Sequence, residues 1–172
     1  MNAVTTASKQ IFFDDVAVGL ELPVLRKGPL TILHLVRWSA ATENWRRIHY
    51  DEKYAVEQQK LPAPLVSGAL KSQFVVQLLK DWAGLEGWVW KAKYQFRSMD
   101  VVGTTLDVRA KVRRTIPLAD YGLVELDVTT TNSEGRESTT GVALVALPYR
   151  AGAPVPYPFV PPQSDPWAED SR

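Results

Sequence analysis

The sequence contains no cysteine and only two histidines, His34 and His49, among its 172 residues. The absence of cysteine excludes a disulfide scaffold, thiolate metal ligands and a cysteine nucleophile, and two histidines are too few for a histidine-rich metal site. No apolar run approaches the about 18 residues that a membrane-spanning helix needs. The first ten residues also lack the apolar stretch and cleavage site of a signal peptide. We therefore expect a cytoplasmic protein without a membrane partner.

A strong charge of either sign is also missing, because 20 lysines and arginines face 19 aspartates and glutamates. Proteins that bind nucleic acids usually carry a basic excess, so we expect no nucleic-acid partner. Hydrophobic residues make up 45% and charged residues 23% of the chain, which is ordinary for a globular protein. A chain of this length can bury a sizeable core without metals or disulfides.

Hydrophobic spacing predicts an α+β fold in which two helices precede an antiparallel sheet. Thr31 is a suitable N-cap for a first helix that ends near Thr42. Apolar residues at three- and four-residue spacing predict a longer, buried helix between Ser67 and Gly84. Alternating patterns predict strands over 88–96, 106–113, 123–131 and 137–147, with an edge strand over 22–27. One buried helix against an antiparallel sheet is an α+β arrangement.

Proline is concentrated at the C-terminal end, where seven of the twelve prolines lie from Pro148 onward. Such a segment can form neither a helix nor an interior strand. We therefore divide the chain into a domain over residues 1–149 and an extended arm over residues 150–172. Aromatic residues in the arm indicate that it packs on a surface, such as that of a partner subunit; a loose tail is the alternative.

Candidate functional residues gather between the two predicted helices. Asn44 lies five positions before His49, and His49 stands between apolar Ile48 and Tyr50. Ser67 and Gly68 follow a second loop, which is rich in proline, and open the longer helix. His34 lies within the first helix, where a structural role is expected.

These features together resemble the MaoC-like (R)-specific enoyl-CoA hydratase and dehydratase family, which has the hot-dog fold. The resemblance covers residues 12–148 and rests on four motifs. They are the opening FFDDVAVGLEL, the segment ATENWRRIHYD followed by YA, the segment LVSG before the longer helix, and the strand entry VGTTL. The family's fold implies an antiparallel sheet wrapped around a long central helix.

The resemblance also implies roles for individual residues. In the family, an Asp at the position of Asn44 and the histidine at His49 hold a water over the double bond of a 2-enoyl thioester. The N–H of Gly68 can stabilise the negative charge that develops on the thioester carbonyl. We therefore expect Asn44, His49 and Gly68 as catalytic residues and Ser67, Arg46 and Arg47 as substrate-binding residues. An acyl-CoA thioester is the expected substrate, with no metal and no cofactor.

The chain departs from the family pattern near the site. Asn44 stands in place of Asp, Glu43 in place of Gly, and Ser67 in place of a frequent His. Because an amide cannot take up a proton, His49 becomes the sole base and Asn44 orients the water. Glu43 and Asp51 are alternative carboxylates, although either can equally serve as a cap or pair with a neighbouring arginine.

Three functions stay open at this point. The first is hydration of a 2-enoyl thioester or the reverse dehydration of a 3-hydroxyacyl thioester. The second is a hot-dog acyl-CoA thioesterase, which needs a carboxylate such as Glu43 or Asp51. The third is a non-catalytic acyl-binding subunit of a heteromeric dehydratase, which the replacement of Asp by Asn44 favours. In each case we expect a homodimer or a higher oligomer, because a long edge strand over 88–96 must be paired or covered.

Overall fold

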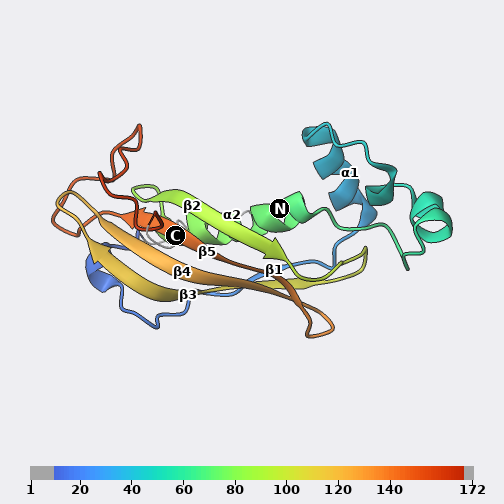
Figure 1. The fold of residues 1–172 in the computed structure, drawn as a ribbon, viewed down its shortest axis with the longest axis horizontal. Coiled ribbons are helices and arrows are strands. Elements are labelled where there is room, and N and C mark those ends of the chain that lie inside the picture. Colours follow the sequence, from blue (N-terminus) through green and yellow to red (C-terminus); the bar gives the residue numbers. More distant parts are fainter. Residues whose placement is uncertain (1–9, 169–172) are drawn as a thin grey trace, which may run out of the picture.

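The computed structural model describes residues 10–168 and contains one antiparallel sheet with the strand order β1-β3-β4-β5-β2. The strands are β1 (Leu25–Lys27), β2 (Trp88–Phe96), β3 (Leu106–Pro117), β4 (Gly122–Asn132) and β5 (Glu137–Leu147). The sheet is long and curved, and the longer helix lies along one of its faces (Figure 1). The predicted α+β class, with an antiparallel sheet and a helix, is confirmed.

Two α-helices and three short helical turns complete the fold. The helices are α1 (Ile32–Ala41) and α2 (Gly68–Ala83), and the turns are η1 (Phe13–Asp15), η2 (Arg47–His49) and η3 (Tyr54–Gln58). Gly84 ends α2 with a φ of 72°, a left-handed conformation that glycine adopts without steric cost. Both helices therefore begin and end where the sequence signals predict.

The main core forms between α2 and the sheet. Val75 and Leu79 of α2 are fully buried against strand residues such as Val108 and Val124. Along β3, buried and accessible residues alternate from Leu106 onward, because successive side chains of a strand point to opposite faces. Each fully buried Val or Leu contributes about 1.5–3 kcal/mol relative to an exposed one, which holds α2 firmly on the sheet.

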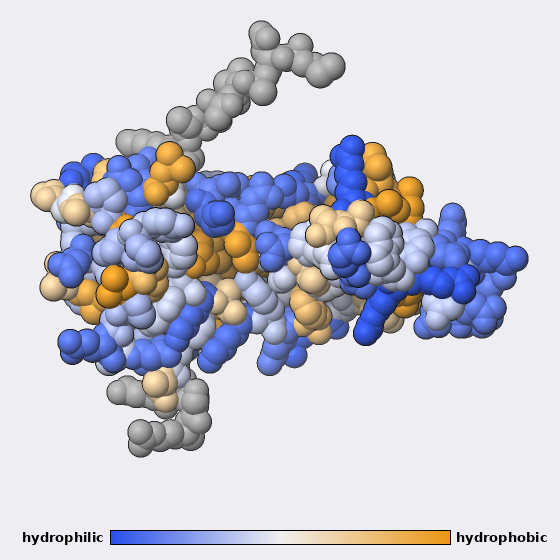
Figure 2. Space-filling view, turned by 90° about the horizontal axis from the view of Figure 1, so that it is seen from above, coloured by the Kyte–Doolittle hydropathy of each residue, from blue (hydrophilic) through white to orange (hydrophobic). Residues whose placement is uncertain are grey.

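The N-terminal end of α2 faces the part of the molecule that contains α1, η2 and η3 (Figure 1). A second apolar cluster joins this part to the sheet, through Leu35 of α1, Leu70 of α2 and Leu106 of β3. The outer side of α1 keeps large apolar residues exposed, among them Leu33 at 53%. Figure 2 shows apolar surface at this end of the molecule.

The described part of the arm, up to residue 168, packs on the sheet of its own chain. The ring of Phe159 stacks on Trp88 with centroids 6.0 Å apart and also contacts Trp90 and Tyr121. Trp167 is 4% exposed, and its Nε1 donates a hydrogen bond to Glu125 Oε1 at 3.0 Å. Within residues 10–168, no helix is long and apolar enough to cross a membrane.

Candidate active site

His49 is held by one hydrogen bond that determines which ring nitrogen carries a proton. The residue ends η2, is 9% exposed, and places Nδ1 at 2.8 Å from the carbonyl oxygen of Leu65. A carbonyl oxygen can only accept a hydrogen bond, so the proton of the neutral ring lies on Nδ1. Nε2 of His49 is therefore left as an acceptor that can take up a proton.

Asn44 is positioned by the way in which α1 ends. Its N–H donates to the carbonyl oxygen of Ser39 at 3.0 Å, the long backbone bond of a Schellman motif. That motif requires a left-handed residue just after the helix, and Glu43 occupies the position with a φ of 52°. The family resemblance places a glycine where Glu43 stands, and glycine adopts this left-handed backbone without steric cost. Within residues 10–168, the half-buried side chain of Asn44 makes no hydrogen bond.

Ser67 and Gly68 form the start of α2. Ser67 is the N-cap residue and is 6% exposed, and Gly68 is the first residue of the helix. The first N–H groups of a helix have no acceptor within it, so the N–H of Gly68 can donate to a ligand. A Cβ atom at Gly68 would lie 2.8 Å from the ring of Phe96. A larger residue at this position would therefore need the exposed ring of Phe96 to move.

The two arginines of the predicted site differ in their contacts. Arg47 donates to Asp51 Oδ2 from Nη2 at 2.8 Å and from Nε at 3.0 Å, and its guanidinium lies 4.5 Å from the ring centre of Tyr54. Arg46 is exposed and forms no ion pair within the described residues. Both line a surface hollow of about 310 Å³ beside η2. Arg46 is thus the freer of the two cations.

The two alternative carboxylates are already occupied by neighbouring groups. Asp51 Oδ1 accepts a hydrogen bond from the N–H of Tyr54 at 2.9 Å. This bond, together with Arg47, lowers the pKa of Asp51 below its ordinary value. Glu43 accepts a hydrogen bond from the indole of Trp45 at 3.1 Å. Asp51 is therefore bonded at both oxygens, whereas Glu43 is exposed and is engaged through Oε2 alone.

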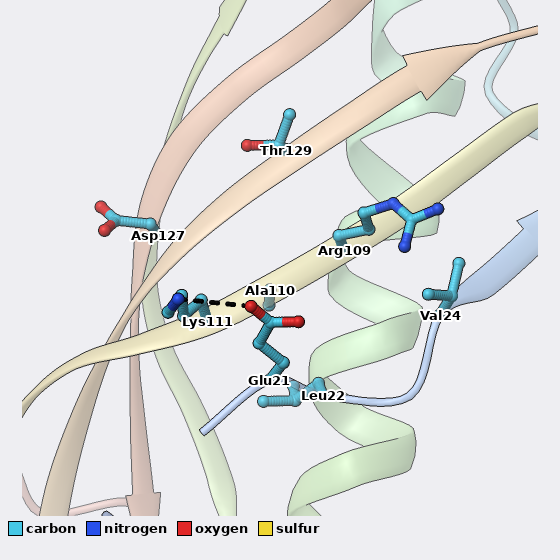
Figure 3. A pocket seen from close by; sticks show the side chains of 8 residues that line it. All are labelled: Glu21, Leu22, Val24, Arg109, Ala110, Lys111, Asp127 and Thr129. Carbon is cyan, nitrogen blue, oxygen red and sulfur yellow. Dashed lines mark hydrogen bonds and ion pairs between the residues drawn. The ribbon is translucent and has the colours of Figure 1, made fainter. Parts of the chain in front are cut away.

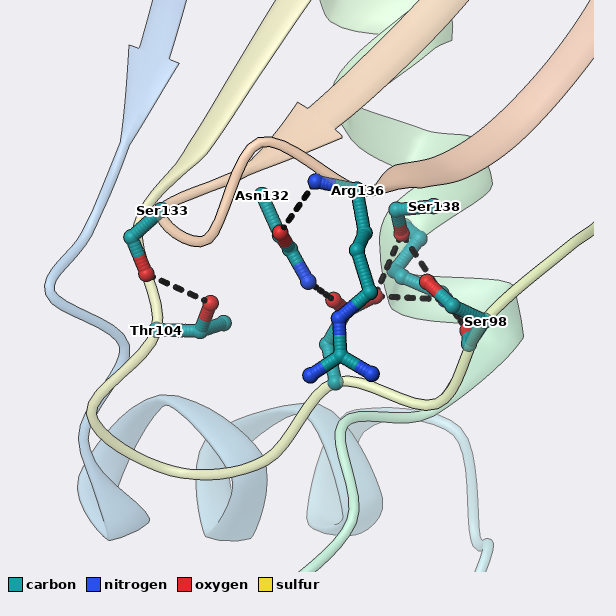
Figure 4. Close-up of polar contacts among 8 residues, drawn as sticks. Ser98, Thr104, Asn132, Ser133, Arg136 and Ser138 are labelled. Atoms are coloured by element: carbon teal, nitrogen blue, oxygen red, sulfur yellow. Dashed lines mark hydrogen bonds and ion pairs between the residues drawn. The ribbon is translucent and has the colours of Figure 1, made fainter.

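The structure also contains a buried polar cluster that the sequence analysis missed. Lys71 is only 2% exposed and pairs with Asp100 at 2.8 Å. Ser138 and Asn132 complete the cluster (Figure 4). The available signal was spacing, because Lys71 lies four residues before buried Val75 on the apolar stripe of α2.

A hollow elsewhere contains none of the predicted site residues. It measures about 370 Å³ and lies between the segment before β1 and strands β3 and β4 (Figure 3). Lys111 approaches Glu21 there at 3.3 Å. Both side chains of this pair are largely exposed, and exposed pairs contribute little binding or folding energy. The candidate site is therefore assigned to His49 and the start of α2.

Comparison with known proteins bears on the family resemblance and the fold. Residues 23–104 match the family model described as hydroxyacyl-thioester dehydratase type 2, and this segment contains all six predicted site residues. The (R)-hydratase PhaJ1 of Pseudomonas aeruginosa superposes with a TM-score of 0.74 at 18% identity, covering 91% of this chain and 97% of the other. The (R)-hydratase of A. caviae gives 0.68 at 22% identity, covering 78% and 98%.

The predicted MaoC-like resemblance is confirmed. A chain of the ChsH1–ChsH2 complex of Mycobacterium tuberculosis has a similar fold, with a TM-score of 0.67 at 18% identity, covering 76% of this chain and 98% of the other. No curated protein matches in sequence. At these identities the structural matches establish the hot-dog fold alone, and the chemistry must be argued from the residues of this chain.

Proposed function

We propose that the protein adds water to a 2-enoyl thioester of coenzyme A, or removes it from the 3-hydroxyacyl product. The single observation that carries the proposal is the fixed ring of His49, whose Nδ1 donates to Leu65 O and leaves Nε2 as a base. The match of residues 23–104 to a dehydratase family model supports hydratase or dehydratase chemistry in general.

The reaction needs one base, one proton donor and one site for negative charge. Nε2 of His49 takes a proton from water as the water oxygen bonds to C3 of the acyl chain. The electrons of the double bond move toward the thioester carbonyl, where the N–H of Gly68 stabilises the enolate oxygen. The imidazolium of His49 then returns its proton to C2. The sum is one water added across the double bond.

Asn44 and the two arginines take supporting roles in this proposal. The amide of Asn44 holds the attacking water by hydrogen bonds, since it cannot accept the proton itself. Arg46 is the better candidate for a coenzyme A phosphate, because Arg47 already pairs with Asp51. Ser67 lies directly before Gly68 and contacts the thioester end of the substrate.

A non-catalytic acyl-binding subunit is the second candidate, and Asn44 in place of an Asp is the observation that favours it. A similar chain occurs in the ChsH1–ChsH2 complex, so the fold is compatible with assembly from two kinds of chain. A thioesterase is less well supported, because Glu43 and Asp51 are both engaged by neighbouring groups.

We further propose that the protein is at least a dimer. Strand β2 lies at the edge of the sheet, and unpaired edges of long strands are usually covered. Exposed apolar residues on α1 provide a second surface for a partner. Sedimentation at micromolar concentration should give a dimer or a higher oligomer, and a monomer would contradict this assembly.

The function is tested by incubating the protein with short, long and aryl 2-enoyl-CoA thioesters. Enoyl absorbance and free thiol are followed in the same sample. Loss of the enoyl signal without thiol release supports a hydratase, whereas thiol release indicates a thioesterase. No change in either signal, with thioester binding detected by calorimetry, indicates a binding subunit.

A further inference from the structure

The buried cluster around Lys71 joins three separate parts of the chain. The ammonium of Lys71, in the first turn of α2, donates to Asp100 Oδ2 at 2.8 Å, to Ser98 O at 2.9 Å and to Ser138 Oγ at 3.0 Å. Asp100 lies in the connection between β2 and β3, and Ser138 lies in β5. One lysine therefore fastens the start of α2 to the connection between β2 and β3 and to β5.

Asp100 is saturated with hydrogen bonds. Besides Lys71, its carboxylate accepts from Asn132 Nδ2 at 3.0 Å and from the hydroxyl of Ser138. These bonds are drawn in Figure 4, where Asn132 and Ser138 approach from β4 and β5. Three donors thus converge on two oxygens, a geometry that an ionised carboxylate satisfies and an amide cannot.

Lys71 stands at a position where stability alone disfavours it. The first turn of a helix carries a partial positive charge, which repels a cation. Lys71 and Asp100 are both only 2% exposed, and burial of two charges has a desolvation penalty that can exceed their mutual attraction. A buried ion pair is therefore weak evidence for stability, and the role of this one is inferred from the geometry that it fixes.

The backbone of Asp100 links this cluster to His49. The carbonyl oxygen of Asp100 accepts a hydrogen bond from the N–H of Val66 at 2.8 Å, and the neighbouring Val101 forms a bridge with Leu65. Leu65 in turn accepts the hydrogen bond of His49 Nδ1 at 2.8 Å. Gly68 begins α2 three residues after Leu65. The segment 65–68 therefore carries both the acceptor that orients His49 and the N–H proposed for the enolate.

We propose that Lys71 and Asp100 are positioning residues, which fix the segment 65–68 and thereby hold the ring of His49 relative to the N–H of Gly68. The ion pair fixes the first turn of α2, and the carbonyl of Asp100 holds Val66, the residue next to Leu65. The proposed effect on the histidine does not depend on which reaction the protein catalyses. Its consequence for turnover rests on the proposed function.

The two histidines allow a direct test, because the structure places their ring protons on different nitrogens. His34 Nδ1 accepts a hydrogen bond from the N–H of Thr31 at 3.0 Å, so its proton lies on Nε2. His49 carries its proton on Nδ1. In full-length protein labelled with ¹⁵N-histidine, at a pH where both rings are neutral, NMR should show one ring of each tautomer. Two rings of the same Nε2–H form would overturn the proposal.

The decisive variant is Asp100→Asn, compared with Glu125→Gln as a matched control. Glu125 is also a buried carboxylate, 3% exposed and paired with Arg114 at 2.8 Å, but it lies near the other end of β4 from Asn132. In Asp100→Asn, His49 should lose its pure Nδ1–H form and show a mixture of tautomers, while His34 stays unchanged. In Glu125→Gln, neither ring should change. A His49 signal unaltered in folded Asp100→Asn overturns the proposal.

If Asp100→Asn does not fold, the milder variant Ser138→Ala tests whether the cluster positions His49. Ser138→Ala removes one donor to Asp100 and leaves the ion pair with Lys71 in place. It should shift the His49 ring nitrogens in the same direction by a smaller amount, and an unchanged His49 overturns the proposal.

Kinetics then separate this role from the proposed function. With a 2-enoyl-CoA substrate, Asp100→Asn should lower kcat about tenfold to hundredfold, as expected for a misplaced catalytic group, and leave KM within about twofold. A loss confined to KM would overturn the positioning role. If the wild type turns over no thioester, the proposed function fails, and the tautomer comparison still decides whether Asp100 positions His49.

Discussion

The two ends of α1 are built from similar polar side chains, yet they serve different purposes. At the N-terminal end, His34 is exposed and accepts the hydrogen bond of Thr31 N–H within a capping box. At the C-terminal end, the Schellman bond from Asn44 N–H to Ser39 O turns the chain toward η2 and the buried His49. The first end therefore only stabilises the helix, whereas the second delivers residues to the candidate site.

This difference shows how two histidines with similar sequence neighbours can be assigned different roles. Both follow apolar residues and precede apolar residues. Only His49 is buried and directs its proton-bearing nitrogen to a main-chain carbonyl, which leaves the other nitrogen as a base. His34 uses its acceptor nitrogen for the helix cap and has none left for catalysis.

The largest expected effect contrasts the two histidines in catalysis. His49→Ala should lower kcat on a 2-enoyl thioester by about 10²–10⁴-fold, the usual contribution of a general base, while His34→Ala keeps activity. Steady-state kinetics of both variants on the same substrate measure this. An inactive His34→Ala variant and an active His49→Ala variant would mean that the active site lies at the N-terminal end of α1.

The next effect sharpens the role of the C-terminal end of α1. Asn44→Asp introduces a carboxylate of nearly the same shape beside the proposed water, so kcat should rise about tenfold, which corresponds to about 1.4 kcal/mol of barrier. The comparison is made with wild type at several pH values on one substrate. Loss of activity in a folded Asn44→Asp protein would mean that the amide donates a bond that a carboxylate cannot.

A smaller effect concerns stability at the N-terminal end. His34→Ala removes the acceptor of the Thr31 N–H and should lower the free energy of unfolding by about 0.5–2 kcal/mol, a typical capping contribution. His34→Gln should retain most of this energy, because Gln at the same position completes a capping box. Urea denaturation of the three proteins tests the pair. Equal destabilisation by Ala and Gln would show that the loss of the capping hydrogen bond does not cause the lower free energy of unfolding.

The smallest effect concerns Glu43, which adopts a φ of 52° at the C-terminal end of α1. A left-handed backbone conformation costs a non-glycine residue about 1–2 kcal/mol. Glycine removes this strain, but ordering its more flexible unfolded backbone costs about 0.5–1 kcal/mol. Glu43→Gly should therefore stabilise the protein by about 0.5–1 kcal/mol in urea denaturation. A destabilised variant would mean that the contact of Glu43 with Trp45 outweighs the backbone strain.

Much of the fold follows from local patterns in the sequence. The strands over 88–96 and 137–147 and the helix between Ser67 and Gly84 lie where periodicity predicts them, because the alternation of apolar residues reports which face is buried. The edge strand is shorter than predicted: β1 comprises Leu25–Lys27, and Glu21 pairs with Lys111 of β3 only as an isolated bridge. Pairing depends on the partner strand, which the local pattern does not contain.

The candidate site could be predicted only in part. Motifs predict Asn44, His49 and Gly68 as site residues, and this stays a prediction. The burial of Lys71 was missed because a lysine on a helix normally lies in solvent. Its partner Asp100 stands 29 positions later and Ser138 stands 67 positions later. No short motif connects residues at such distances, so only the folded structure brings them together.

The central claim is that this site adds water to the acyl chain and leaves the thioester intact. The most direct measurement is mass spectrometry of the product formed from a 2-enoyl-CoA in H₂¹⁸O. We expect the wild-type protein to place one ¹⁸O atom on C3 of an intact acyl-CoA, and His49→Ala to place none under the same conditions. An ¹⁸O atom in a released carboxylic acid, or no incorporation by wild type, would contradict it.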